Sequence, residues 1–101
     1  MDTEFLEQAA DMLKSMGHPL RLKIVMFLQG GEQTVGAISE DIGASQSATS
    51  QHLNMMKMKR ILRSRRDATT VLYSVARPEV FKIIHCIGVQ QSSERKMNSD
   101  E

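Results

Sequence analysis

Apolar residues recur three or four positions apart through most of this chain, which is the spacing of a helix with one buried side. The first such segment ends before Gly17, and the second begins with Pro19 in its first turn. The pattern predicts helices over residues 3–16, 19–29, 35–42, 46–58 and 79–89.

Between residues 61 and 75 the helical spacing gives way to alternation. β-Branched and aromatic residues dominate the second half of this stretch, with Val71, Tyr73 and Val75 on one face. We expect a β-hairpin here, with its tip around residues 66–68. The chain is therefore mainly α with a small β-hairpin, in the order helix, helix, helix, helix, strand, strand, helix.

The third and fourth helices are joined in the manner of a helix-turn-helix. Thr34 can cap the third helix and Ser45 the fourth, because their hydroxyls can accept hydrogen bonds from free amides of the first turn. Gly43 stands between the helices, where a helix C-terminus commonly needs a positive φ. This arrangement delivers the fourth helix to a nucleic-acid groove, and the rest of the chain serves as its platform.

The outer face of the fourth helix suits the reading of base edges. Its inner side carries Ala48, Leu53 and Met56, with His52 partly included. Its outer side carries short hydroxyl and amide side chains, namely Gln46, Ser47, Ser50, Gln51 and Asn54. Amides pair with the donors and acceptors of bases, and serines allow close approach. A merely solvated face would mix Glu with Lys, and neither occurs here before Lys57, so we favour DNA contact.

Charge is concentrated on one part of the chain, although the formal net charge is only +1. Six cations and no acid lie between Lys57 and Arg66, while four acids and no cation precede Lys14. One basic face of this kind is enough for phosphate contact. Arg65 and Arg66 at the hairpin tip can lie along the sugar-phosphate backbone, although arginines at such a tip can also be simply solvated.

The length of 101 residues fits one small domain, which we place at residues 1–90, followed by a polar, disordered tail at 91–101. The last helix is apolar on more than one face, so we expect a homodimer.

The single cysteine, Cys86, excludes an intrachain disulfide and suits a reducing cytoplasm. No signal peptide or apolar run of membrane-spanning length is visible, so we expect a cytoplasmic protein without a membrane partner.

This order of elements resembles the ArsR/SmtB family of bacterial winged-helix repressors. The matching stretches are GHPLRLKIVMFL in the second helix, SQSATSQHL in the fourth and SRRDATTVLYSV in the hairpin. The resemblance covers residues 13–84 and implies a winged helix-turn-helix fold. It also implies a homodimer through the first and last helices, with the fourth helices in successive major grooves of a palindromic double-stranded DNA operator.

Roles for individual residues follow from the same resemblance. Bases and nearby phosphates would be contacted by Gln46, Ser47, Ser50 and Gln51, and the DNA backbone by Lys57, Arg65 and Arg66. Repression would come from occluding a promoter. An effector would release the DNA by favouring another geometry of the dimer.

The sensing sites of the family are not matched here. Members that bind soft metals on the third helix carry cysteines there, whereas residues 33–37 read QTVGA. A sulfur-sensing branch uses two cysteines at positions that align with Met26 and Ser92. The donors near the last helix are limited to Glu79, His85 and Cys86, and their spacing does not match a metal site. We therefore expect no metal and no cofactor, and the effector stays open.

Three further positions depart from the family pattern. Arg60 stands where a glycine commonly ends the fourth helix, and Ala68 replaces a glycine at the hairpin tip. Thr49 takes a position that is usually apolar, so its hydroxyl needs a backbone carbonyl as partner.

Cys86 and the methionines have ordinary structural explanations. A free cysteine on an apolar helix is most often a buried small hydrophobe, so we favour that role for Cys86 over a sensor. Methionines at helical spacing, here Met55, Met56 and Met58, are usually core filler. His18 suits the start of the second helix.

Enzymatic function is not indicated, because the chain has no phosphate-binding glycine loop and no grouping of histidine, cysteine and acid. Two alternatives to an effector-released repressor stay open. One is a winged-helix domain that binds a protein, although the cations between Lys57 and Arg66 would then need an acidic partner. The other is a DNA-binding regulator without any effector.

Overall fold

The computed structural model describes residues 2–86 and confirms the predicted order of elements. The helices and hairpin strands are α1 (Thr3–Met16), α2 (Pro19–Phe27), α3 (Val35–Ile42), α4 (Gln46–Met58), β2 (Leu62–Asp67) and β3 (Thr70–Val75), and residues 79–86 are helical. The 3-10 turn η1 (Leu28–Gly30) follows α2, so the predicted second helix ends earlier than expected. No helix within residues 2–86 could cross a membrane. The predicted tail at 91–101 lies outside the described residues.

A short third strand joins the predicted hairpin. This strand, β1 (Gln33–Thr34), pairs antiparallel with β3, and the sheet order is β1-β3-β2. The sequence predicted only two strands, because a two-residue strand carries no periodicity of its own. Pairing with β1 ties the base of the hairpin to the segment just before α3.

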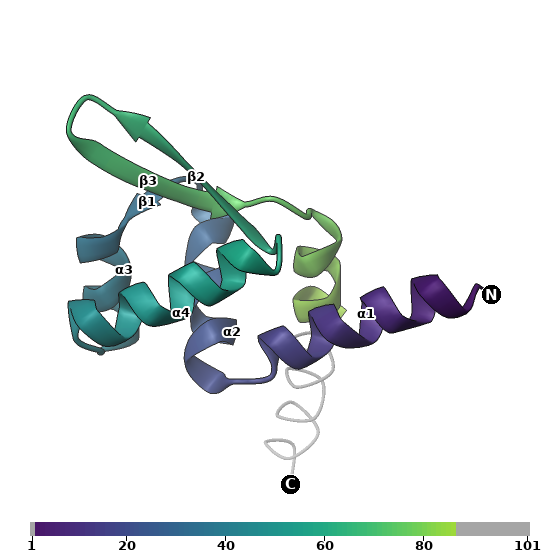
Figure 1. Cartoon of the computed structure of the whole chain (residues 1–101). Helices are drawn as coiled ribbons and strands as arrows, with labels where there is room; N and C mark the ends of the chain where they lie inside the picture. The colour runs from purple at the N-terminus through teal and green to yellow at the C-terminus, as the bar shows by residue number, and fades with distance from the viewer. Residues whose placement is uncertain (1, 87–101) are drawn as a thin grey trace, which may run out of the picture.

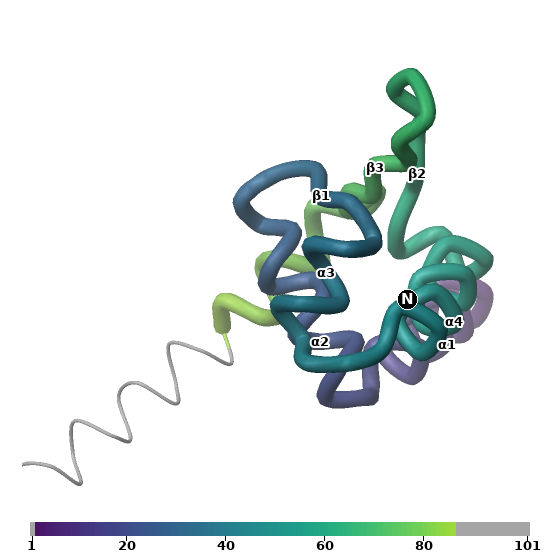
Figure 2. The backbone as a smooth tube through the Cα atoms, turned by 90° about the vertical axis from the view of Figure 1, so that its left-hand side faces the viewer, coloured from purple at the N-terminus to yellow at the C-terminus, as the bar shows by residue number. Residues whose placement is uncertain are grey.

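One apolar core lies beneath the sheet, between the helices. It contains Met16, Ile24, Val25, Leu28, Ile38, Ile42, Leu53, Met56, Ile61, Leu62, Tyr73 and Val80. In Figure 1 the hairpin β2–β3 projects from this body above α3 and α4, and α1 runs outward to the N-terminus. Figure 2 shows the same hairpin standing clear of the helices. The fold is a winged helix-turn-helix with β2–β3 as the wing.

Local sequence signals set the helix-turn-helix as predicted. Thr34 Oγ1 accepts from the Ala37 amide at 3.1 Å, and Ser45 Oγ accepts from the Ala48 amide at 3.0 Å. Gly43 adopts φ 71°, so the chain reverses between α3 and α4 without a side-chain clash.

Arg60 and Ala68 adopt the left-handed conformation that glycine favours, with φ 62° and φ 57°. These are the two positions where the family resemblance places glycine. Each side chain costs roughly 1–2 kcal/mol in this region of φ/ψ space. The turn that ends α4 and the tip of the wing therefore both adopt a positive φ without a glycine.

The apolar face of α1 is covered only at its C-terminal end. Met16 is 3% exposed and packs in the core, whereas Phe5, Leu6 and Leu13 are 53%, 50% and 50% exposed. Figure 1 shows the N-terminal half of α1 extending away from the rest of the described chain. An exposed row of large apolar side chains on a small domain is typical of an interaction surface.

Candidate nucleic-acid interface

The outward face of α4 carries the residues that the sequence predicted for DNA reading. Five of them are exposed, namely Gln46, Ser47, Gln51, Asn54 and Lys57, and Ser50 is half-buried. The opposite side, with Thr49, Leu53 and Met56, is fully buried against the core. The helical period therefore brings this set together on one strip, and no acid interrupts it.

Thr49 keeps its hydroxyl satisfied inside the core. Its Oγ1 donates to the carbonyl oxygen of Ser45 at 2.8 Å, which confirms the expected backbone partner. Ser45 takes part in both contacts, because its hydroxyl caps α4 and its carbonyl accepts from Thr49, so two hydroxyl contacts fix the first turn of α4.

Met58 was predicted as core filler, and this prediction is wrong. Its side chain is 76% exposed, on the outward side of α4, whereas Met56 is fully buried. Helical spacing explains the difference, because a step of two residues turns the side chain to the other side of the helix.

The two arginines near the wing tip point to opposite faces of the sheet. Arg66 pairs with Val71 across the hairpin and shares its face with the buried residues Leu62 and Tyr73, so it lies on the side of the helical body. Arg65 lies on the other face. The prediction that both arginines contact the DNA backbone stays a prediction, but the wing cannot present them in the same direction.

Arg65 is held by a carboxylate from outside the wing. Its Nε and Nη2 donate to the two carboxylate oxygens of Glu32 at 2.7 and 2.9 Å. This hydrogen bonding raises the pKa of Arg65 and lowers the pKa of Glu32. No local pattern in the sequence points to Glu32, because it lies 33 positions from its partner, in the loop before β1.

A second contact ties α4 to the N-terminal helices. The Arg21 guanidinium donates from Nε to His52 Nδ1 at 3.2 Å and from Nη1 to the Ser15 carbonyl at 3.1 Å. Arg21 is therefore half-buried in spite of its charge. His18 accepts from the Leu20 amide at 3.1 Å through Nδ1, as expected for the start of α2, and its ring lies 4.7 Å from the His52 ring.

The surroundings of His52 favour the neutral imidazole. Burial lowers its pKa most, and the nearby His18 and Arg21 lower it further. Because the folded-state pKa lies below the ordinary value of about 6.5, the unfolded chain binds a proton first as the pH falls. The stabilisation from the neutral ring is therefore fully present above the ordinary pKa, which applies to the unfolded chain. It is lost as the pH drops through the folded-state pKa.

We expect acid to loosen the attachment of α4 through this histidine. The free energy of unfolding of the parent, measured with urea, should fall between pH 8 and pH 5. A His52→Gln variant, which keeps a polar acceptor but does not titrate, should show a smaller fall. An equal pH dependence in the two proteins would remove His52 from this explanation.

Cys86 is exposed, so the prediction of a buried thiol is wrong, whereas its predicted inertness stays a prediction. The helix that carries it buries Val80 fully and leaves Ile83 and Ile84 half-buried. Within residues 2–86, no three side chains of the histidine, cysteine and acid types lie close enough to hold a metal ion. A sensing role for Cys86 stays untested.

The wing and the outward face of α4 define a DNA-binding protein of the winged helix-turn-helix class. The family described as "Bacterial regulatory protein, arsR family" matches residues 18–64, from the residue before α2 to the middle of β2. The HTH-type transcriptional regulator YgaV of Escherichia coli is 46% identical over 79 residues, which are 77% of this chain and 80% of YgaV. The chain therefore belongs to the ArsR family of bacterial regulatory proteins.

Two other comparisons agree with this assignment. The nodulation protein NolR of Rhizobium meliloti is 42% identical over 81 residues, and the match spans 80% of this chain but only 66% of NolR. A homodimeric winged helix-turn-helix domain from Mycobacterium bovis superposes with a TM-score of 0.81 at 26% identity, covering 93% of this chain and 87% of that one. Members of this family are DNA-binding transcriptional regulators and not enzymes, and the matching relatives include proteins named as repressors and one named as an activator.

Proposed function

We propose that this protein is a transcriptional repressor that binds a palindromic operator as a homodimer and is released by an effector. The observation that carries the proposal is the acid-free outward strip of α4, with Gln51 and Asn54 exposed on it. Amide side chains on such a strip can reach base edges in a major groove, while Lys57 supports the helix on phosphate.

The exposed face of α1 supports the dimeric part of the proposal. Phe5, Leu6 and Leu13 are each about half exposed, and a second copy of the same face is the simplest cover for them. A two-fold dimer would place its two α4 helices about 34 Å apart, the repeat of one turn of DNA. The operator would then carry two half-sites related by the same symmetry.

In this proposal the protein acts in the cytoplasm. Repression would follow when the bound dimer covers a promoter. An effector that prefers another dimer geometry would lower the affinity for DNA by its difference in binding to the two states. The α1 face and the wing lie at different ends of the molecule, so a change in the dimer can alter how both wings meet the duplex (Figure 1).

Arg66 offers the sharpest test of DNA contact through the wing. Arg66→Gln should weaken binding to every DNA sequence and lower the slope of log affinity against log salt by about 0.9 for each phosphate that is no longer neutralised. Arg63→Gln is the matched control, because it removes the same charge from the other face of the same strand. We expect its salt slope to stay at the parent value.

The measurement is fluorescence anisotropy with DNA from the promoter of the protein's own gene, titrated at several salt concentrations. A salt slope unchanged in Arg66→Gln would remove Arg66 from the interface. Absence of DNA binding by the parent at low salt would contradict the repressor proposal itself and favour a protein partner.

A further inference from the structure

A cavity of about 560 Å³ lies beside the wing, and Arg63 and Arg65 line it whereas Arg66 does not. Its lining comes from three parts of the chain that are distant in sequence: η1 with the loop after it, the two strands of the wing, and Phe81 of the terminal helical segment. A volume of this size is within the range of small-molecule sites in proteins. The cavity therefore joins the DNA-binding wing to the helix that follows it.

The floor of this cavity is apolar. Leu28 is 3% exposed and Phe81 is half-buried, and both line the cavity. When an apolar body covers apolar side chains that line a hollow open to water, the free energy of the system falls. A ligand that is charged throughout would not use this floor.

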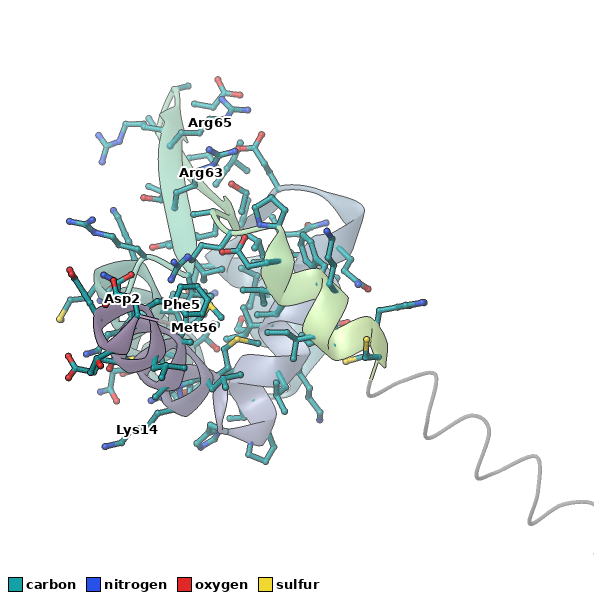
Figure 3. The ribbon with its side chains drawn as sticks, turned by 90° about the vertical axis from the view of Figure 1, so that its right-hand side faces the viewer. Asp2, Phe5, Lys14, Met56, Arg63 and Arg65 are labelled. Carbon is teal, nitrogen blue, oxygen red and sulfur yellow. The ribbon has the colours of Figure 1, made fainter. Side chains whose placement is uncertain are left out.

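The rim of the cavity is basic. Arg63 and Arg65 are two positions apart on β2, so both project from the same face of the wing. Figure 3 shows the two side chains one above the other along the hairpin. Glu32 also lines the cavity and holds Arg65 through two hydrogen bonds.

One positive charge on this rim is left over. Two guanidinium groups face one carboxylate, and Arg63 makes no ion pair with any acid among residues 2–86. Its Nε has only a long hydrogen bond, 3.4 Å, to Ser74 Oγ. A single negative charge placed here would bring the net charge of this set to zero, whereas a dianion would make it negative.

We propose that this cavity binds a small amphipathic carboxylate, with its apolar body on Leu28 and Phe81 and its carboxylate on Arg63. Guanidinium groups prefer planar carboxylates because two N–H groups can donate in parallel. The bound carboxylate also lies within reach of Arg65 and competes there with Glu32. Breaking the Glu32–Arg65 ion pair would loosen the outer part of the wing, while the β1–β3 pairing still holds its base.

The consequence for DNA rests on the proposed function, while the binding site itself does not. A ligand that loosens the wing favours a conformation with weaker operator binding, which is the behaviour of an effector. The proposed site thereby names a chemical class for the effector, which the sequence leaves open.

Decanoate is a suitable probe, because it has one carboxylate and an apolar chain. Titration calorimetry of the full chain without DNA should show saturable binding of one decanoate per protomer. Decan-1-ol, which has the same chain without the charge, should bind much more weakly. No saturable binding of decanoate would overturn the proposal.

Two variants locate the site. Arg63→Gln should weaken decanoate binding by about tenfold, and Arg63→Lys, which keeps the charge, should lose less. Arg66→Gln removes the same charge from the opposite face of the strand and should bind decanoate like the parent. Parental binding in Arg63→Gln, or an equal loss in Arg66→Gln, would rule out this cavity. Circular dichroism melting confirms that each variant is folded.

A separate measurement addresses the effector role. Saturating decanoate should lower the operator affinity of the parent by about fivefold or more and should have little effect on Arg63→Gln. Bound decanoate without any change in operator affinity would overturn the effector role. Because ligand binding is measured without DNA and operator binding without ligand, failure of one is distinguished from failure of the other.

Discussion

Replacing Leu13 with Glu should leave the chain folded and reduce its affinity for a two-half-site operator by at least roughly 100-fold. Leu13 is 50% exposed, so the substitution creates no cavity in the core. In the proposed dimer, the new carboxylate would have to be buried against the apolar face of a second α1, which is strongly unfavourable. A monomer can occupy only one half-site, and the gain from joining the two is lost.

Lys14→Glu is the matched control for this experiment. It introduces the same side chain one position further along α1, and Figure 3 shows Lys14 pointing to the other side of the helix from Phe5. Sedimentation velocity should show a dimer for the parent and Lys14→Glu, and a monomer for Leu13→Glu. A dimeric Leu13→Glu protein with parental operator binding would place the dimer interface elsewhere.

Replacing Gln51 with Ala should cost about 1–3 kcal/mol of operator binding for each half-site and relax the base preference at the contacted position. Gln51 is exposed, and its truncation leaves no buried polar group without a partner. The loss should therefore appear in DNA binding and not in the free energy of unfolding.

The appropriate readout is competition binding with a set of operators that differ by single base pairs. Gln29→Ala, the same truncation at an exposed position in η1, should bind like the parent. A uniform loss over all sequences in Gln51→Ala would make Gln51 a phosphate contact. No loss would remove it from the reading face.

The helix-turn-helix was predictable because its determinants are local. Thr34 and Ser45 bond to amides three residues ahead, and Gly43 needs only its own freedom to adopt a positive φ. The two sides of α4 follow from the helical period alone. The expected carbonyl partner of Thr49 also lies within the same helical turn.

Other features depend on contacts between segments that are far apart in the sequence. The strand β1 exists because β3 passes beside it, and the Arg21–His52 hydrogen bond joins residues 31 positions apart. The exposure of Cys86 is likewise decided by what packs against its helix, so the apolar composition of that helix pointed to the wrong answer.

The sequence by itself determined that this chain folds as a helix-turn-helix with a wing and that α4 carries one exposed strip without an acid. Those properties rest on periodicity, capping and turn residues, which act over a few positions. Only the tertiary structure decided which way the wing's arginines face and which of them pairs with an acid. Alternation along β2 separates Arg66 from Arg65, and the fold brings Glu32 to Arg65 from the loop before β1. Such pairing depends on the three-dimensional path of the chain, and no local pattern encodes it.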